Sequence, residues 1–360
     1  MTIDDKNILW LDLFDYLTYS KKFKLLEAIN KGENLREKFL TTFEIKNILT
    51  SEEFNRMALC LSDEYLNRNI ASYEKDGVQL ITFNNANYPY ILKEISTPPL
   101  CLYCKGDIEL LNTFSLAVVG TRKPTEYGIQ VTKQYCKELT MSNVTIVSGL
   151  AMGIDGTAHT TALENKGKTI AVLAGGFNHI YPATNYQLAN EIIANGLLIS
   201  EYPPNTKPLS YYFPVRNRII AGLSKGVLVP EMGEKSGSMH TINYAIEYNR
   251  DIFVVPGKIT SPMSKGANLL IKNLQGCITI SPEDVLENYK LIKEEKPKIN
   301  QQLDLNSQMI LNFIESEKRT YQEILDYTKL PANELNTLLI MLEIEGLLIK
   351  LPNNSYIMSQ

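Results

Sequence analysis

Three short turns rich in glycine and hydroxyl side chains could hold a phosphate group. Each follows an apolar run and precedes a helical pattern, so each would lie where a helix begins. A helix start offers free backbone N–H groups and a partial positive charge, and an arginine adds a fork of donors. For the third turn, ordinary turn chemistry is the alternative interpretation. The turns are Gly120-Thr121-Arg122, Ser148-Gly149 and Lys235-Ser236-Gly237-Ser238.

Two further arginines lie in the segment Arg216-Asn217-Arg218, just after Phe213. Guanidinium groups bind phosphate through paired hydrogen bonds and stack on bases, and an aromatic ring offers another stacking surface. Residues 210–275 carry eight basic and four acidic side chains, an excess of four positive charges in a chain whose net charge is −4. A single arginine more commonly faces a surface acid. The clustering nevertheless predicts a local basic surface for a polyanion.

The usual signatures of nucleotide enzymes and metal sites are missing from the sequence. There is no G-x-G-x-x-G, P-loop or G-x-S-x-G pattern, and the three histidines are not spaced with other ligands as in a zinc site. Asp155 could cap a helix or contact a ligand, and His159 fits a packed role better than a catalytic one. Cys101 and Cys104 form an isolated C-x-x-C, which favours two buried thiols. We therefore expect neither a metal nor a cofactor.

Buried strands must position these turns. Six apolar runs, bounded by glycine or small polar residues and separated by helical patterns, predict a doubly wound α/β domain with a mostly parallel sheet. In such domains ligands bind beyond the carboxyl ends of the strands, where the turns lie. The runs cover residues 116–120, 145–149, 169–176, 197–202, 225–231 and 251–257.

The rest of the chain suggests a four-part organisation. Residues 1–70 alternate apolar and charged side chains at helical spacing, which predicts a small helical domain of the SAM or helix-hairpin-helix kind. Residues 71–290 hold the Rossmann-like domain. Residues 291–306 are polar and charged, as in a linker. Three helical patterns and a hairpin within 307–360 predict a winged helix.

The charge of the C-terminal segment favours binding to a protein, or to the rest of its own chain, over binding to duplex DNA. Residues 301–360 hold four basic and eight acidic side chains, whereas DNA affinity depends on basic groups that displace counterions. The chain shows no signal peptide and no apolar run of about 20 residues, and its five scattered cysteines fit a reducing compartment. We therefore predict a cytoplasmic protein without a membrane span.

Eight short motifs occur in a fixed order along the chain. They are GTR (120–122), SGLAMGID (148–155), Tyr181-Pro182, SEYPP (200–204), FPVRNRIIAGLS (213–224), KSGS (235–238), VPG (255–257) and GANLLI (266–271). Together they resemble the motifs of the DprA/Smf family of bacterial DNA-processing proteins. Two positions depart from the family pattern. Thr121 replaces the commoner serine, and Val229-Pro230-Glu231 stands where Val-Glu-Ala is more frequent, which leaves the role of Glu231 open.

The resemblance implies an extended Rossmann-like fold, a homodimer and a protein that is not an enzyme. It further implies that the protein binds single-stranded DNA, protects incoming DNA and loads the RecA recombinase onto it during natural transformation. Arg122 would contact the DNA. The full set of expected DNA-binding residues is Gly120, Thr121, Arg122, Ser148, Gly149, Phe213, Arg216, Asn217, Arg218, Lys235, Ser236, Gly237, Ser238 and Asn268.

Two other functions stay open on the sequence alone. A Rossmann-like hydrolase acting on a nucleotide derivative would need an acid, for which Glu201 or Glu231 is available, but the P-G-G-x-G-T-x-x-E pattern of such enzymes is absent. An adaptor would use the helical and winged-helix segments to dock proteins, with DNA contact secondary.

Overall fold

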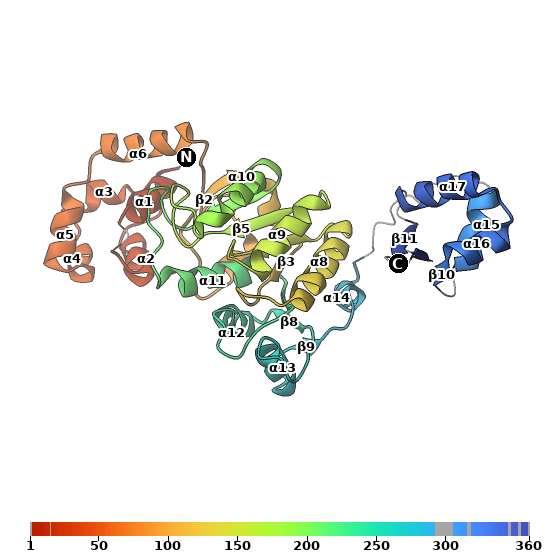
Figure 1. Cartoon of the computed structure of the whole chain (residues 1–360). Coiled ribbons are helices and arrows are strands. Elements are labelled where there is room, and N and C mark those ends of the chain that lie inside the picture. The colour runs from red at the N-terminus through yellow and green to blue at the C-terminus, as the bar shows by residue number, and fades with distance from the viewer. Residues whose placement is uncertain are drawn as a thin grey trace. The chain divides into compact units, whose positions relative to one another are not determined.

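The chain forms two compact units, Met1–Glu294 and Glu295–Gln360 (Figure 1). The computed structural model describes residues 2–14, 16–291, 305–314, 318–344, 347–351 and 354–358. Most of the predicted linker, 291–306, lies outside these ranges, and its last two residues, Leu305 and Asn306, begin a helix. The predicted boundary between residues 70 and 71 falls inside the first unit and stays a prediction.

A nine-stranded sheet lies at the centre of the first unit (Figure 1). Its order is β1-β2-β6-β5-β4-β3-β7-β8-β9; neighbours from β6 to β9 pair in parallel, and β1 and β2 add antiparallel strands at one edge. All six predicted runs lie in the parallel part, which confirms the doubly wound α/β class. The strands are β1 (Gln79–Thr82), β2 (Cys101–Gly106), β3 (Ser115–Val118), β4 (Thr145–Ser148), β5 (Thr169–Val172), β6 (Leu197–Ser200), β7 (Gly226–Val229), β8 (Asp251–Val254) and β9 (Cys277–Ile278).

The winding of the sheet reverses at β3. From β3 the chain moves outward through β4, β5 and β6, and it then returns to place β7 on the other side of β3. The loops that follow β3 and β7 therefore lead to helices on opposite faces. Such a reversal leaves a crevice beyond the carboxyl ends of the two strands, which is the usual ligand position in open α/β sheets.

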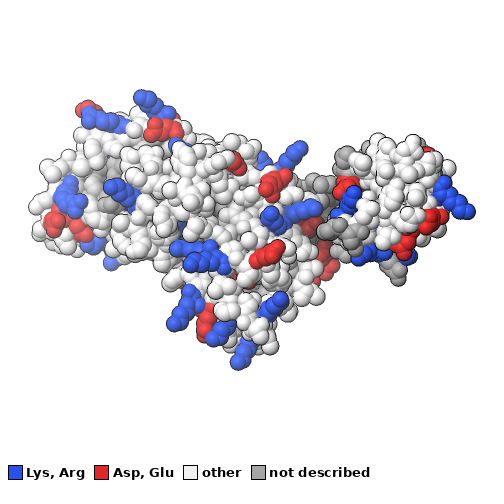
Figure 2. All heavy atoms as spheres, in the orientation of Figure 1, with Lys and Arg blue, Asp and Glu red and all other residues white. Residues whose placement is uncertain are grey.

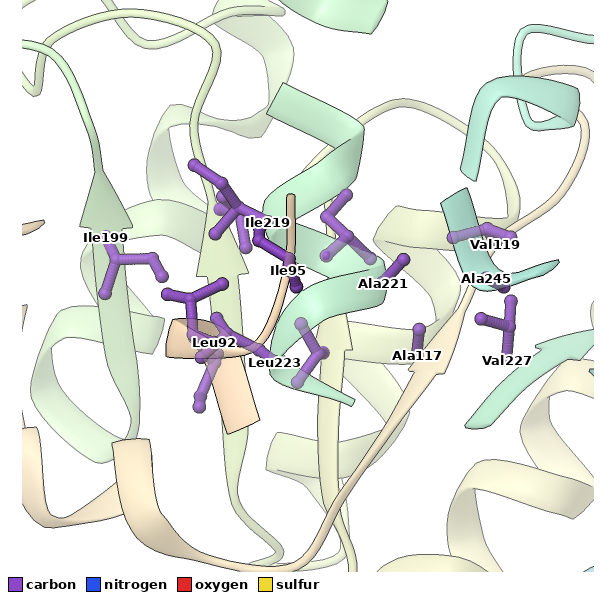
Figure 3. Packing of buried hydrophobic residues seen from close by; sticks show 14 of the residues in the cluster. Leu92, Ile95, Ala117, Val119, Ile199, Ile219, Ala221, Leu223, Val227 and Ala245 are labelled. Atoms are coloured by element: carbon purple, nitrogen blue, oxygen red, sulfur yellow. The ribbon is translucent and has the colours of Figure 1, made fainter. Parts of the chain in front are cut away.

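Helices cover both faces of the sheet because side chains alternate along each strand. Leu116 and Val118 pack with the helices of one face, whereas Ala117 and Val119 pack with those of the other. Figure 3 shows the second face, where side chains of α11 and of the segment around Leu92 pack with those of the strands. The first face holds α8 (Glu126–Met141), α9 (Ile154–Glu164) and α14 (Pro282–Asn288), and the second holds α7 (Tyr90–Lys93), α11 (Tyr212–Leu223), α12 (Met239–Glu247) and α13 (Lys265–Lys272).

The N-terminal segment is helical, as predicted, and shares a core with the sheet. Trp10 is buried and meets Phe14 and Phe39 edge-on, with ring centroids 5.2 and 5.4 Å apart. The same apolar cluster includes Tyr103 and Leu198 of the sheet. The elements are α1 (Ile3–Asp12), α2 (Tyr19–Glu27), α3 (Leu35–Lys38), α4 (Phe43–Ile48), α5 (Ser51–Ala58) and α6 (Asp63–Lys75), while α10 (Tyr186–Asn195) and the 3₁₀ turns η1 (Ile108–Asn112) and η2 (Ala183–Asn185) complete the unit.

The described residues of the second unit form three helices and a small antiparallel sheet of order β10-β12-β11. Its core holds Ile310, Ile324, Leu339 and Tyr356. The elements follow the order expected for a winged helix, an assignment that stays a prediction, and the predicted hairpin turn at 352–354 lies partly outside the described residues. They are α15 (Leu305–Ile314), β10 (Arg319–Thr320), α16 (Tyr321–Thr328), α17 (Ala332–Ile344), β11 (Leu348–Leu351) and β12 (Ser355–Met358).

Within the described ranges, none of the helices combines the length and the apolar character that a bilayer crossing requires.

Candidate nucleic-acid interface

A pocket of about 770 Å³ lies at the carboxyl ends of β3 and β7, where the winding reverses. The loop after β3 and the loop after β7 form two of its walls, and the first turns of α11 form a third. Ten of the fourteen predicted DNA-binding residues line it. They are Gly120, Thr121, Arg122, Phe213, Arg216, Asn217, Lys235, Ser236, Gly237 and Ser238.

Two hydrogen bonds hold the loop after β3, one to the loop after β7 and one within the loop itself. The Ser238 hydroxyl donates to the Gly120 carbonyl over 2.7 Å, which joins this loop to the one after β7. The Lys123 amide donates to the Thr121 hydroxyl over 3.1 Å. Arg122 and Lys123 are exposed, so two cations stand at the wall of the pocket.

The start of α8, which the sequence predicted to hold a phosphate, does not line the pocket. Thr125 caps this helix by accepting from the Gly128 amide. Buried Glu231 then accepts from both the Thr125 amide, over 2.8 Å, and the Thr125 hydroxyl, over 2.7 Å. Glu231, whose role the sequence left open, therefore anchors the start of α8 through Thr125.

Ser148 and Gly149 lie behind the pocket and do not line it, contrary to the prediction. The Ser148 hydroxyl is fully buried and donates to the Val118 carbonyl. The Gly149 amide donates to Asp155, and its carbonyl accepts from Arg216 over 2.8 Å. A Cβ at position 149 would stand 2.6 Å from Nη2 of Arg216, so only glycine fits against this guanidinium.

Arg216 forms the floor of the pocket. Its guanidinium donates to the carbonyls of Gly149 and Val172 at the ends of β4 and β5. Arg216 as a whole is only 4% exposed. Burial lowers the pKa of Arg216 to about 10, against the attraction of Asp155, so the group stays charged at neutral pH. Burial likewise raises the pKa of Asp155, although Arg216 and the Gly149 amide favour its charged form.

Asp155 and His159 both lie on α9, and Asp155 also lines the pocket. The helix cap is Gly153 and Asp155 occupies the first turn, so Asp155 is not the cap, and its contact with a ligand stays a prediction. His159 is fully buried, with Nδ1 2.7 Å from the Thr169 hydroxyl. Burial lowers the pKa of His159 to about 3, and nearby Arg216 adds to the effect. The imidazole is therefore neutral, which confirms the packed role predicted for it.

Arg218 points away from the pocket, which corrects its assignment as a DNA contact. Residues two apart on a helix face about 200° from one another, so α11 cannot direct Arg216 and Arg218 to one ligand. Arg218 forms a buried ion pair with Glu201, at 2.5 Å between nitrogen and oxygen. Burial opposes the charge on Arg218, but Glu201 more than offsets it and raises the pKa of Arg218.

Asn268, in α13, also lies outside the pocket lining. Its amide closes a loop instead, because Oδ1 accepts from the Gly257 amide over 3.1 Å and Nδ2 donates to the Gly257 carbonyl over 3.0 Å. The expectation that Asn268 contacts DNA thus gives way to a structural role. Asn217, by contrast, faces the pocket, where its Nδ2 lies 3.5 Å from the Gly237 carbonyl.

The pocket also contains residues to which the sequence assigned no role. Tyr181, from the loop after β5, meets Phe213 edge-on with ring centroids 5.4 Å apart. The Arg122 guanidinium lies 5.8 Å from the centre of the Phe213 ring. Lys123, His240 and the acid Glu234 also line the pocket. The only sequence signal for a role of Tyr181 was its place in the Tyr181-Pro182 motif. No motif in the sequence indicated that Lys123 would be exposed beside Arg122.

The two acids considered for a hydrolase are engaged elsewhere. Glu231 is bound to Thr125 and Glu201 to Arg218, and neither lines the pocket. Lysine and arginine side chains gather over α11, α12 and α13 on the face seen in Figure 2, with few acids among them. The arrangement offers guanidinium and ammonium groups, hydroxyls and two aromatic rings, which suits non-covalent binding of a nucleotide chain.

Comparison with known proteins agrees with this geometry. The family described as DNA recombination-mediator protein A matches residues 79–290. Over 224 residues the chain is 46% identical to the DNA processing protein DprA of Bacillus subtilis, covering 62% of this chain and 75% of that protein. It is 44% identical over 217 residues to protein Smf of Escherichia coli, which covers 60% of this chain and 58% of the relative.

Two solved structures extend the comparison. DprA from Streptococcus pneumoniae gives a TM-score of 0.68 at 34% identity over 80% of this chain and 98% of its own. A structure of Helicobacter pylori DprA, described for its single-stranded DNA binding mode, gives a TM-score of 0.54 at 34% identity. The match covers 59% of this chain and 96% of the Helicobacter chain. Because the family pattern covers more than half of the residues, the chain belongs to the DprA/Smf family.

Proposed function

We propose that this protein binds single-stranded DNA in the pocket between β3 and β7 without cleaving it. The observation that carries the proposal is the lining itself, where exposed Arg122, Lys123 and Lys235 surround the paired rings of Phe213 and Tyr181. Cations hold phosphates and rings stack bases, a combination that tolerates any sequence. An unpaired base can enter a concave pocket, whereas a base stacked inside a duplex cannot.

Relatives support this assignment and its biological setting. The Helicobacter protein, described for single-stranded DNA binding, is a DprA of 34% identity, and the Bacillus relative is a DNA processing protein. On this basis the protein protects single strands that enter the cell in natural transformation and loads RecA recombinase onto them in the cytoplasm. The acidic C-terminal segment, 301–360, is then a contact for protein and not for duplex DNA.

One experiment tests these roles together. The full chain and a chain lacking residues 301–360 are titrated with labelled single- and double-stranded oligonucleotides, and both are added to RecA-dependent strand pairing and nuclease protection assays. We expect both chains to prefer and protect single strands, and only the full chain to stimulate pairing. Equal affinity for duplex, or release of free base from nucleoside monophosphates, would contradict the binding proposal. Unchanged stimulation by the shortened chain would remove the role of the C-terminal segment.

The proposal includes a homodimer formed through the edge of the sheet at β9. This strand is last in the sheet order, so no strand among the described residues pairs with its outer edge. It carries the exposed apolar side chain of Ile278, with exposed Leu274 and Ile280 nearby. A free strand edge with apolar neighbours is suited to pairing with a second copy. We expect a dimer in sedimentation velocity and a monomer after Ile278→Lys with Ile280→Lys. A wild-type monomer at micromolar concentration would reject it.

A further inference from the structure

Tyr181 has the properties of a surface for stacking a base. It follows β5, lines the pocket and is 54% exposed, although its neighbours Ala174 and Phe177 in the same loop are buried. An exposed tyrosine is common on any protein surface. Here, however, the ring stands in a concave site with three exposed cations, and it is fixed from one side by Phe213.

Phe213 is less available than its sequence context indicates. Its ring is partly buried and already has two neighbours, the Arg122 guanidinium at 5.8 Å and the Tyr181 ring at 5.4 Å with an interplanar angle of 69°. A cation over an aromatic ring is attracted by its negative face. A base that stacked on that face would have to displace Arg122, a cation that the phosphates also require.

A base that stacked on Tyr181 would not have to displace Arg122 from the Phe213 ring. An edge-to-face contact occupies at most one face of either ring, and Tyr181 lines the pocket with more than half of its surface exposed. The Phe213 contact also fixes the Tyr181 ring before the ligand arrives, which reduces the entropy lost on binding.

We propose that Tyr181 is the base-stacking residue of this site and that Phe213 positions both Tyr181 and Arg122. The inference rests on the proposed single-stranded DNA binding and refines it by assigning the base contact. It assigns no preference among the four bases, because every base presents a π-face. A tyrosine hydroxyl is not required for stacking, so phenylalanine should serve equally well at this position.

The test compares a thymidine oligonucleotide with an abasic oligonucleotide of the same length by fluorescence anisotropy. We expect Tyr181→Ala to weaken binding of the thymidine strand about tenfold, the effect of losing one stacked base. Tyr181→Phe should bind like the wild type. On the abasic strand, which offers phosphates but no base, Tyr181→Ala and the wild type should bind equally.

Tyr186 supplies a matched control, because it is 60% exposed, follows five residues later and does not line the pocket. Tyr186→Ala should leave both affinities unchanged. Unaltered binding of the thymidine strand by Tyr181→Ala would overturn the inference, as would an equal loss on both strands, which indicates a damaged pocket. If the wild type binds neither strand, the proposed function itself fails, an outcome distinct from either of these.

Discussion

Replacing Arg218 with alanine is expected to lower the free energy of unfolding by about 3–5 kcal/mol, the usual cost of leaving one charge of a buried pair without its partner. The side chains of Arg218 and Glu201 are 7% and 13% exposed, and their closest nitrogen and oxygen atoms are 2.5 Å apart. Without the guanidinium, Glu201 must protonate, draw in water or move. Urea denaturation followed by circular dichroism measures the loss.

Two controls separate this effect from charge removal in general. Arg68 forms an exposed pair with Glu64 on α6, and Arg68→Ala should change stability by less than about 0.5 kcal/mol. Replacing both Arg218 and Glu201 with methionine should recover most of the stability, because a buried pair exchanged for apolar side chains is often neutral. If Arg218→Ala leaves stability intact but abolishes DNA binding, Arg218 is a DNA contact after all.

The central strands of the sheet could be predicted because they are buried on both faces. Continuous apolar runs such as 116–120 and 225–231 have few alternatives, and the turns that end them are rich in glycine. All six runs became parallel strands, and the predicted ligand edge contains the pocket. Burial of Cys101 and Cys104 in β2 also agrees with their interpretation as packed thiols.

The predicted site residues that lie outside the pocket were misplaced for one physical reason. Composition and spacing do not show which partner inside the protein satisfies a polar side chain. Arg216 and Arg218 are close in sequence to the predicted phosphate-binding turns. The helical repeat of α11, however, directs Arg216 to the pocket and Arg218 to Glu201. The hydroxyl of Ser148 and the amide of Asn268 are likewise used inside the protein. Helical periodicity, applied to 213–224, was the available signal that separates the two arginines.

Replacing Arg122 and Lys235 together with alanine is expected to weaken single-stranded DNA binding about 25-fold at 0.1 M salt, since each phosphate contact on a single strand releases about 0.7 counterion. Both side chains are exposed at the pocket lining, so their removal leaves no buried charge and should not change thermal stability appreciably. The slope of the logarithm of affinity against that of salt concentration should become shallower by about 1.4. Filter binding at several salt concentrations gives both quantities.

A second double variant, at Lys258 and Lys272, tests whether DNA binds in the pocket or over the whole basic surface. Both are exposed and belong to the same basic region, 210–275, but neither lines the pocket. Their double alanine variant changes the net charge by the same amount as the pocket variant. If DNA followed the overall positive field of this region, the two double variants would lose affinity equally. If the crevice between β3 and β7 holds the strand, the Arg122 and Lys235 variant alters both the affinity and the salt slope and the Lys258 and Lys272 variant alters neither, because only the first pair lines the pocket.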